Sequence, residues 1–551
     1  MSSSSSSSSS SHLFLFPFAA LSLAAAGTGL QAGSENCTAP ASEAEDLSLL
    51  QALRRGHDAI KPLVIPGLGS LVGNKVPGGS MEYLNISYAV RPGRFQAAEL
   101  NTSWHSVLDA TKYGHSCIQA TGRELSEDCL NLNVWTPQGK PSSPLPVWFW
   151  IYGGGLISGS GSLYNGSELS SKYKLVVVTI NYRLGALGWL AVGDNKSSGA
   201  MNGWHDTLVA LRWVKSYIAA FGGDPEKIYI GGESGGSLLT CQHLFSPLTA
   251  AVGIAGVTLE SGSCVGPWGP NTMRSSFTQS LDWMKYALGG GSRPRLVKKA
   301  KEAHSKLYRK KVAYGNSCCG PSAVDGKFFT KLPVDSKFAV PPRVRVLLGS
   351  NSIDGIATFS DHHPVSKEAL IDLLRRQGLR ANATDVVKFY TQTPGLGRIE
   401  DPDVGKWTLL FWQIHRDASN TCPTLLLAER LSEYGASDVY LYWEDFARDK
   451  KDFHGSELSL FWGSGYTGGP PFNVNTVMGT QDMLRNFLYG AEPATSWKSF
   501  AENPKQQNYL KLSKNPVPQS GYERTACAFW RKFYDGPLKL REQFFRFGWK
   551  R

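Results

Sequence analysis

From about position 145 onward, two kinds of hydrophobic pattern alternate along the chain. Short, continuous apolar runs rich in β-branched and aromatic residues occupy 146–152 (PVWFWIY), 174–184 (KLVVVTINYRL) and 227–232 (KIYIGG). Runs of this kind predict strands that are buried on both faces. Between the second and third runs, 205–221 repeats its apolar positions with a helical period. Strand, helix and strand at this spacing predict βαβ units and a mainly parallel sheet.

Two later runs, 344–352 (VRVLLGSNS) and 437–446 (SDVYLYWEDF), predict further strands of the same sheet. Hydrophobic residues make up 42% of the 551 positions and charged residues 19%, which is typical of a globular protein. The pattern extends over most of the chain, which favours one large domain over several small ones. We therefore expect an α/β fold with a central, mostly parallel, twisted sheet flanked by helices.

The segment 229–239 (YIGGESGGSLL) places a G-x-S-x-G sequence between a predicted strand and a predicted helix. A serine in such a turn has a strained backbone, and the small residues around it let strand and helix approach closely. The turn lifts the hydroxyl above the sheet edge, with the helix N-terminus directed at the reacting oxygen. Five residues alone also fit a structural turn, but the strand-turn-helix context favours Ser234 as a nucleophile.

A second glycine run lies in 150–160 (WIYGGGLISGS), at the end of another predicted strand. Acyl-transfer enzymes stabilise the oxyanion of their tetrahedral intermediate, usually with backbone N–H groups. Consecutive glycines leave such groups uncovered, so Gly154 and Gly155 are candidate donors, with Gly235 as a third. A Lys-Ser/Thr pair does not follow the run, which argues against a phosphate-binding loop.

With these motifs in view, the chain resembles the type-B carboxylesterase/cholinesterase family of α/β-hydrolases. Segments 126–137 (SEDCLNLNVWTP) and 220–237 (AFGGDPEKIYIGGESGGS) are similar to two of its signatures. Segments 83–95 (YLNISYAVRPGRF) and 181–190 (NYRLGALGWL) look like its N-terminal hairpin and the strand after its oxyanion loop. The resemblance covers about 65–530 and implies the α/β-hydrolase fold in a single catalytic domain, which we place at 61–551.

The family resemblance implies a serine, an acid and a histidine in that chain order. His454 matches the family's histidine in DFHGSELSLFWG, and Asp354 in LLGSNSIDGIATF stands where the family usually has glutamate. The shorter carboxylate can still orient an imidazole if its loop moves inward by about one bond length. Asp325 and Asp361 are the alternative acids. The chemistry requires no metal and no organic cofactor.

Nine cysteines in a chain that is expected to be secreted predict disulfides with one thiol left over. CxxC spacing does not occur, which argues against a zinc site. The resemblance implies the pairs Cys117–Cys129 and Cys422–Cys527. We expect Cys264 to pair with Cys318 or Cys319 and Cys241 to be buried and reduced, while the pairing of Cys37 stays open.

The resemblance also bears on the substrate. Tyr152 before the glycine run is the cholinesterase form of that position. Cholinesterases, however, carry a tryptophan in the loop between the first two cysteines, where it holds the choline cation. Residues 118–128 (IQATGRELSED) contain no aromatic side chain and are too short for a lipase lid. We therefore expect a small or soluble carboxylic ester as substrate.

The N-terminus predicts the compartment. A serine run at 2–11 precedes an apolar stretch at about 13–26, which suits a signal peptide ending near residue 26 and is short for a membrane span. Residues 27–60 form an N-terminal extension. Six Asn-x-Ser/Thr sites agree with secretion of a glycoprotein: Asn36, Asn85, Asn101, Asn165, Asn195 and Asn382. We expect a secreted protein without integral membrane association.

The formal net charge of +12 is concentrated in 293–311 and in 539–551. The first segment has a helical apolar period, so a solvated face of an amphipathic helix is the favoured interpretation, with an anionic partner as the alternative. A nucleic-acid partner is not expected. The sequence leaves the oligomeric state open.

Three functions remain under consideration. The first is a secreted serine hydrolase of small-molecule carboxylic esters. The second uses the same nucleophile for acyl transfer, lactonisation or a non-hydrolytic step in secondary metabolism. The third is a non-catalytic, cholinesterase-like recognition domain, which the complete set of Ser234, Asp354 and His454 argues against.

Overall fold

The computed structural model describes most of the chain from residue 61 to residue 536. The described ranges are 61–104, 106–122, 124–192, 200–267, 269–311, 323–326, 328–329, 331–354, 363–396, 405–446, 454–466 and 470–536. Several predictions fall outside them: the signal peptide, the extension 27–60, Asn36, Cys37, Asn195, Cys318, Cys319, Asp361 and the basic tail 539–551.

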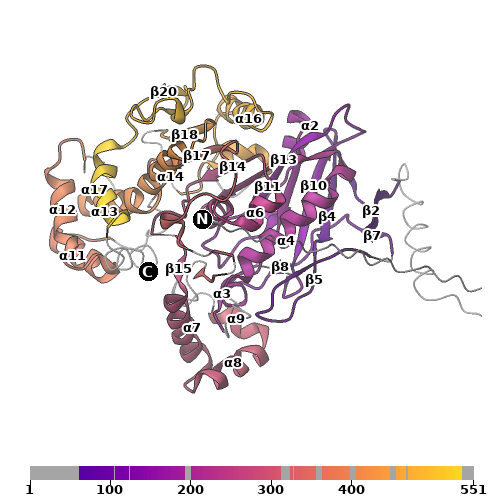
Figure 1. The fold of residues 1–551 in the computed structure, drawn as a ribbon, viewed down its shortest axis with the longest axis horizontal. Helices are drawn as coiled ribbons and strands as arrows, with labels where there is room; N and C mark the ends of the chain where they lie inside the picture. The colour runs from indigo at the N-terminus through magenta and orange to yellow at the C-terminus, as the bar shows by residue number, and fades with distance from the viewer. Residues whose placement is uncertain are drawn as a thin grey trace, which may run out of the picture. The chain divides into compact units, whose positions relative to one another are not determined.

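The centre of the fold is an eleven-stranded sheet in the order β20-β19-β18-β17-β14-β13-β11-β12-β10-β4-β3 (Figure 1). The bounds are β3 Asn74–Val76, β4 Ser80–Ser87, β10 Asn131–Pro137, β11 Leu145–Ile151, β12 Val176–Ile180, β13 Gly223–Glu233, β14 Gly256–Glu260, β17 Arg345–Asn351, β18 Val439–Glu444, β19 Tyr509–Leu512 and β20 Val517–Gln519. The pairs from β12 through β19 are parallel, and the outer pairs are antiparallel. This confirms the predicted mostly parallel sheet.

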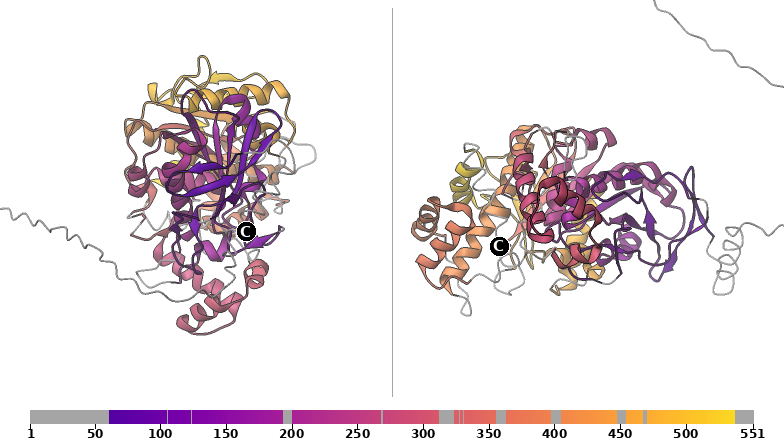
Figure 2. Two further views of the ribbon diagram at one scale, coloured as in Figure 1. Left: turned by 90° about the vertical axis from the view of Figure 1, so that its right-hand side faces the viewer. Right: turned by 90° about the horizontal axis from the view of Figure 1, so that it is seen from below.

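Helices lie on both faces of the sheet (Figures 1 and 2). Their bounds are α2 Ser167–Tyr173, α3 Gly185–Trp189, α4 Asn202–Tyr217, α5 Gly235–His243, α6 Pro247–Val252, α7 Met273–Leu288, α8 Arg293–Glu302, α9 Ser305–Lys311, α11 Lys367–Leu374, α12 Asn382–Gln392, α13 Lys406–Arg416, α14 Cys422–Glu433, α15 Leu458–Trp462, α16 Val474–Leu488 and α17 Arg524–Tyr534. Because both faces are covered, all residues of β11, β12, β14, β17 and β18 are buried.

Shorter strands form small separate sheets at the periphery. Their bounds are β1 Leu63–Ile65, β2 Gly69–Val72 and β7 Leu108–Asp109 in one sheet; β5 Ala89–Val90 and β6 Glu99–Leu100 in a second; β8 Ser116–Cys117 and β9 Leu125–Ser126 in a third; and β15 Asn271–Thr272 and β16 Ala323–Val324 in a fourth. The pair β8–β9 holds the two ends of the short loop that follows Cys117.

The amphipathic pattern at 205–221 corresponds to α4 and the 3₁₀ turn Ile218–Phe221 that follows it. The helix begins three residues earlier than the pattern predicts, because Asn202, Gly203 and Trp204 are buried and extend it inward.

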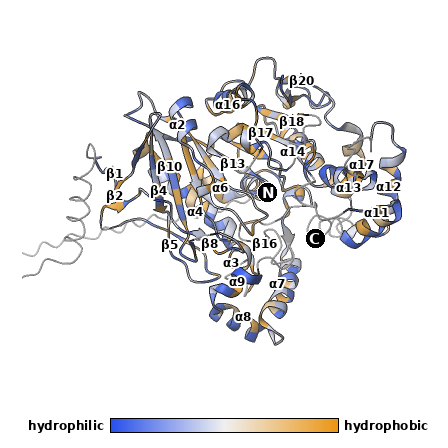
Figure 3. Cartoon of the chain, turned by 180° about the vertical axis from the view of Figure 1, so that it is seen from behind, coloured by the Kyte–Doolittle hydropathy of each residue, from blue (hydrophilic) through white to orange (hydrophobic). Residues whose placement is uncertain are grey.

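The alternation of hydrophilic and hydrophobic residues is visible along α8 in Figure 3. Within the described ranges, the helices are too short or too polar to cross a membrane.

Three disulfides join the described cysteines: Cys117–Cys129, Cys241–Cys264 and Cys422–Cys527. The second corrects two expectations, since Cys241 is not a free thiol and Cys264 does not pair with Cys318 or Cys319. The physical reason lies in the sheet order. Because β13 and β14 are parallel neighbours, α5 after β13 and the loop after β14 leave the same edge side by side. Their Cα atoms at Cys241 and Cys264 are therefore 5.6 Å apart.

Candidate active site

Ser234 lies in the turn between β13, which ends at Glu233, and α5, which begins at Gly235. Its backbone has φ 53° and ψ −120°, a left-handed conformation that residues with a side chain rarely adopt. Such strain persists only where the surroundings enforce it. Here the Ser234 N–H donates to the carbonyl of Glu260 on β14 at 2.9 Å, which fixes the turn against the neighbouring strand.

The glycines of the motif are required by close approach of the backbone. A Cβ atom on Gly236 would lie 1.9 Å from the carbonyl oxygen of Ile151 on β11. A Cβ on Gly232 would lie 2.5 Å from the carbonyl carbon of Gly236. Side chains at these positions would separate α5 from the sheet, so the motif encodes the position of the serine as well as its turn.

Ser234, His454 and Asp354 form a continuous chain of contacts. Ser234 Oγ lies 2.7 Å from His454 Nε2, and His454 Nδ1 lies 2.7 Å from Asp354 Oδ1. Asp354 follows the carboxyl end of β17, and its other carboxylate oxygen accepts the Asn351 N–H at 3.1 Å. These three side chains come from segments 120 and 100 residues apart along the chain, and the sheet order brings their ends together.

The first alternative acid, Asp325, has a local role instead. Its Oδ1 accepts the backbone N–H groups of Phe328 at 2.8 Å and Phe329 at 3.3 Å, so it caps a turn. The second alternative, Asp361, lies outside the described residues.

The glycine run after β11 lies directly beside the nucleophile. A Cβ on Gly153 would be 3.0 Å from the Ser234 Cβ. Gly154 and Gly155 have φ values of 101° and 61°, which turn their peptide units away from the strand direction. The position of a Cβ on Gly235 would be 3.3 Å from the Gly155 nitrogen. The described residues supply no acceptor for the N–H groups of Gly154 and Gly155, which leaves both available to a ligand.

Comparison of the sequence with known proteins identifies the family. A sequence profile of the carboxylesterase family matches residues 61–530. The chain belongs to the carboxylesterase family. A mouse (Mus musculus) cholinesterase is 27% identical to it in an alignment 565 positions long, which covers 90% of each chain. Membership identifies the protein as a serine ester hydrolase of the type-B carboxylesterase class, as the motifs predicted.

In this carboxylesterase, charged neighbours set the basicity of the histidine. Burial alone lowers the pKa of His454, but the hydrogen-bonded Asp354 and the nearby carboxyl groups of Glu233 and Glu457 raise it and outweigh burial. The net result is a pKa above the ordinary 6.5 of an imidazole. The Glu233 carboxylate is the nearest of these neighbours after Asp354, with its Oε1 3.5 Å from His454 Nε2.

A cluster of buried carboxyl groups surrounds the histidine, and it was not predicted from the sequence. Burial raises the pKa of Glu233 to about 8 and that of Glu457 to about 7. Glu457 accepts hydrogen bonds from Ser261 and from Asn351, so it connects the loop after β14 with the end of β17. Glu260, also buried, has a pKa well above its ordinary value because of burial. Neither of its carboxylate oxygens has a hydrogen-bond partner among the described residues.

A signal for two of these residues was present in the motifs already identified. Glu233 is the variable position of G-x-S-x-G, and Glu457 follows His454 by three residues. Both are acidic residues close in sequence to a reacting group, which marks them as candidates for a place in the active site. Glu260 had no comparable signal, because only the pairing of β13 with β14 brings it close to the serine.

Tyr152, the residue before the glycine run, is completely buried. Its ring stacks on that of Tyr182 with centroids 4.6 Å apart. Each hydroxyl donates to the other residue's carbonyl, Tyr182 to Tyr152 at 2.9 Å and Tyr152 to Tyr182 at 3.3 Å. The tyrosine thus fixes the start of the glycine run.

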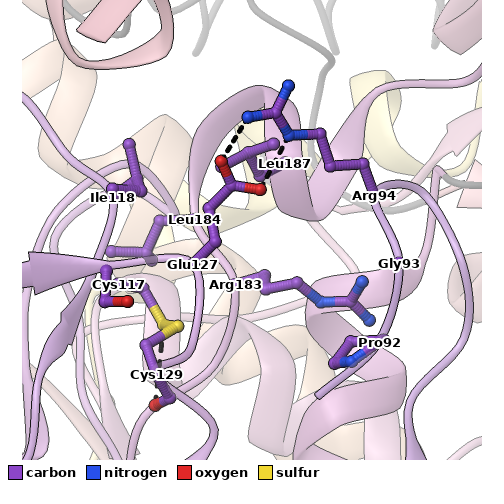
Figure 4. Close-up of a pocket in the computed structure, with 11 residues that line it drawn as sticks. Pro92, Gly93, Arg94, Cys117, Ile118, Glu127, Cys129, Arg183, Leu184 and Leu187 are labelled. Carbon is purple, nitrogen blue, oxygen red and sulfur yellow. Dashed lines mark hydrogen bonds and ion pairs between the residues drawn. A yellow bond between two sulfur atoms is a disulfide. The ribbon is translucent and has the colours of Figure 1, made fainter. Parts of the chain in front are cut away.

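The Cys117–Cys129 disulfide borders a small pocket that lies apart from Ser234 (Figure 4). Arg94 and Glu127, which both line it, form an ion pair, and Arg183, a third lining residue, pairs with the buried Asp206 at 2.7 Å. The lining contains none of the three residues Ser234, His454 and Asp354. Each charged side chain that lines the pocket has an ion-pair partner, so the pocket is a structural junction. Within the described ranges, His, Cys, Asp and Glu side chains do not form a group that could hold a metal ion.

Proposed function

We propose that the protein is a secreted esterase that hydrolyses small or soluble carboxylic esters through an acyl-enzyme intermediate. The observation that carries the proposal is the unbroken chain from Ser234 Oγ through the His454 imidazole to the Asp354 carboxylate, with 2.7 Å at each contact. The same residue types in this order perform acyl transfer on several unrelated folds.

In the first half of the reaction, neutral His454 carries its proton on Nδ1 and donates a hydrogen bond from there to the Asp354 carboxylate. As Ser234 Oγ attacks the ester carbonyl carbon, its proton passes to His454 Nε2. The carbonyl oxygen becomes an oxyanion, for which the N–H groups of Gly154, Gly155 and Gly235 are the donors. Collapse of the tetrahedral intermediate breaks the bond to the alcohol oxygen, which takes the proton from Nε2 and leaves as the alcohol.

In the second half, water replaces the alcohol. His454 Nε2 removes a proton from the water as its oxygen attacks the acyl carbon. Collapse of the second intermediate returns that proton to Ser234 Oγ and releases the carboxylic acid. The raised pKa of His454 makes the imidazole a stronger base, and it also means that the neutral form from which the reaction starts becomes more populated as the pH rises.

The short loop after Cys117 supports a small ester over a choline ester. The mouse relative is named a cholinesterase, but binding of a quaternary ammonium ion requires aromatic faces. Residues 118–128 contain none. Secretion is supported by three disulfides in the described chain, since such bonds persist in oxidising compartments. Asn85 and Asn165 are exposed and Asn101 and Asn382 partly exposed, as acceptors of N-glycans must be.

The test combines a fluorophosphonate probe with turnover of p-nitrophenyl acetate and butyrate. We expect the wild-type protein to be labelled and to hydrolyse both esters, and Ser234→Ala to lose labelling and at least about 10³-fold of kcat. A folded wild-type protein that is neither labelled nor active would contradict the proposal and favour a recognition domain. Product analysis with an added acceptor alcohol separates hydrolysis from acyl transfer, because a transferase would form the new ester in preference to the acid.

A further inference from the structure

A basic surface formed by α8 and α9 has no part in the proposed chemistry. Residues 293–311 contain nine Lys and Arg and a single acid, Glu302, so this segment holds eight of the chain's twelve net positive charges. The two helices form a group with α7 at the lower margin of the domain in Figure 1. We call residues 293–311 the basic surface.

The cations of the basic surface face solvent. Leu296, Ala300 and Tyr308 are buried and form the inner side of the two helices. Seven of the nine basic side chains are exposed: Arg293, Arg295, Lys298, Lys301, Lys306, Arg309 and Lys310. Neutralisation within the surface is slight, because Glu302 approaches only Lys298, at 4.0 Å.

The surface is held rigidly on the domain. The Arg94 guanidinium, paired with Glu127, donates to the carbonyl of Lys301 at 3.0 Å and to that of Ala303, so it caps the end of α8. Ser305 at the start of α9 donates to Glu127 at 2.5 Å. These contacts hold the two helices in one arrangement on the domain, which lowers the entropy cost of binding an extended polyanion.

The chemistry of the surface excludes several kinds of partner. Large exposed hydrophobic side chains are absent from α8 and α9 within the described ranges. A protein interface needs an apolar core depleted of charge, and a membrane-binding helix needs an apolar face, so neither fits. The three disulfides indicate an oxidising compartment, where nucleic acids are not the usual polyanions. Acidic polysaccharides are the remaining class of extended polyanion.

We propose that the basic surface binds a sulfated or carboxylated polysaccharide and thereby retains the enzyme at an acidic extracellular matrix. The proposal rests on secretion as part of the proposed function, but it uses none of the residues of the ester-hydrolysing site. Binding occurs through contacts of the exposed Lys and Arg with sulfate or carboxylate groups, and it releases counterions from the polymer.

The experiment uses the full secreted protein and immobilised heparin as the probe. The test variant is Lys298→Gln/Lys301→Gln/Lys306→Gln/Lys310→Gln. The matched control is Lys61→Gln/Lys75→Gln/Lys140→Gln/Lys514→Gln, which removes the same charge from exposed positions outside the surface. We expect the test variant to bind heparin about tenfold more weakly at a salt concentration of about 0.15 M, with a shallower salt dependence. The control should stay within about twofold of wild type.

The proposal would be overturned by a wild-type protein that elutes from heparin in low salt, or by a control that weakens as much as the test variant. Preference for vesicles of anionic phospholipid over heparin would also overturn it. Turnover of p-nitrophenyl butyrate is measured in all three proteins and should be equal. Heparin binding without turnover would refute the esterase proposal alone, and turnover without binding would refute this one alone.

Discussion

At the scale of single residues, the acid of the proposed triad is Asp354, which is shorter than the glutamate that the family usually has at this position. The Asp354 N–H donates to the Asn351 carbonyl at 3.3 Å, while the Asn351 N–H donates to Asp354 Oδ2 at 3.1 Å. These reciprocal bonds close a tight turn at the end of β17. The turn brings the backbone of Asp354 close to His454, so an aspartate spans the distance for which the family usually has a glutamate.

Two substitutions test this arrangement. Asp354→Asn should lower kcat by about 10⁴-fold with the fold retained, because the amide stabilises the wrong tautomer of His454. Asp354→Glu should lower kcat by about 10- to 100-fold, because the longer side chain displaces the imidazole from Ser234. Both are measured as kcat for p-nitrophenyl butyrate, with circular dichroism to verify folding. Full activity of the glutamate variant would show that the turn does not set the length of the acid.

At the scale of elements, α5 is the helix on which the site depends. Its first turn is tied to the loop after β14, since Ser237 Oγ donates to the Gly262 carbonyl at 2.7 Å. A Cβ on Gly262 would lie 2.5 Å from the Ser234 carbonyl oxygen, so this loop lies directly against the nucleophile's backbone. The Cys241–Cys264 disulfide joins the same loop to the other end of α5.

Breaking this disulfide should therefore affect both stability and catalysis. We expect Cys241→Ser/Cys264→Ser to lower the free energy of unfolding by roughly 3 kcal/mol, as the chain-entropy model gives for a loop of this length. We also expect kcat to fall by about tenfold at unchanged KM, because the loop no longer holds the strained turn. The measurements are urea unfolding and steady-state kinetics.

The control for that prediction is Cys422→Ser/Cys527→Ser. This bond closes a longer loop, with a sequence separation of 105, so its loss should destabilise the protein by about 5 kcal/mol. Neither α14 nor α17, the helices that it joins, carries a residue of the proposed triad, and kcat should stay near the wild-type value. A larger loss of kcat in the control than in Cys241→Ser/Cys264→Ser would show that stability alone governs the activity.

At the scale of the whole molecule, the buried carboxyl groups govern how stability depends on pH. Burial raises the pKa values of Glu233, Glu260 and Glu457 above the ordinary 4.5. Between pH 4.5 and those raised values, the folded protein holds more protons than the unfolded chain. The stabilisation is therefore complete below pH 4.5 and is lost as the pH rises through the folded-state pKa values. These groups should make the protein more stable at mildly acidic than at alkaline pH.

The midpoint temperature of thermal unfolding should accordingly decrease as the pH is raised from 6 to 9. Glu260→Gln should reduce that fall, because its carboxyl group has no hydrogen-bond partner among the described residues and its ionisation opposes folding. The control, Glu99→Gln, changes an exposed glutamate and should leave the pH dependence as in wild type. Differential scanning calorimetry across the pH series measures all three. An unchanged slope in the Glu260 variant would contradict this account.

The sequence by itself determined the strands, the main helix and the nucleophile turn. The apolar runs at 146–152 and 227–232 correspond to β11 and β13, and G-x-S-x-G lies between β13 and α5 as predicted. Such features are local: periodicity, turn geometry and close packing of glycine depend on residues a few positions apart. The family resemblance also named His454 and Asp354, which periodicity alone could not have selected.

Only the tertiary structure decided which distant segments of the chain lie next to one another. The pairing of Cys241 with Cys264, the nearness of Glu260 to Ser234 and the support of α8 by Arg94 all join segments whose adjacency depends on strand order and loop direction. A sequence pattern does not fix that adjacency, because each contact depends on the packing of the entire sheet and not on its own residues. The low-dielectric surroundings that raise the carboxyl pKa values arise in the same way, from burial that many distant residues create together.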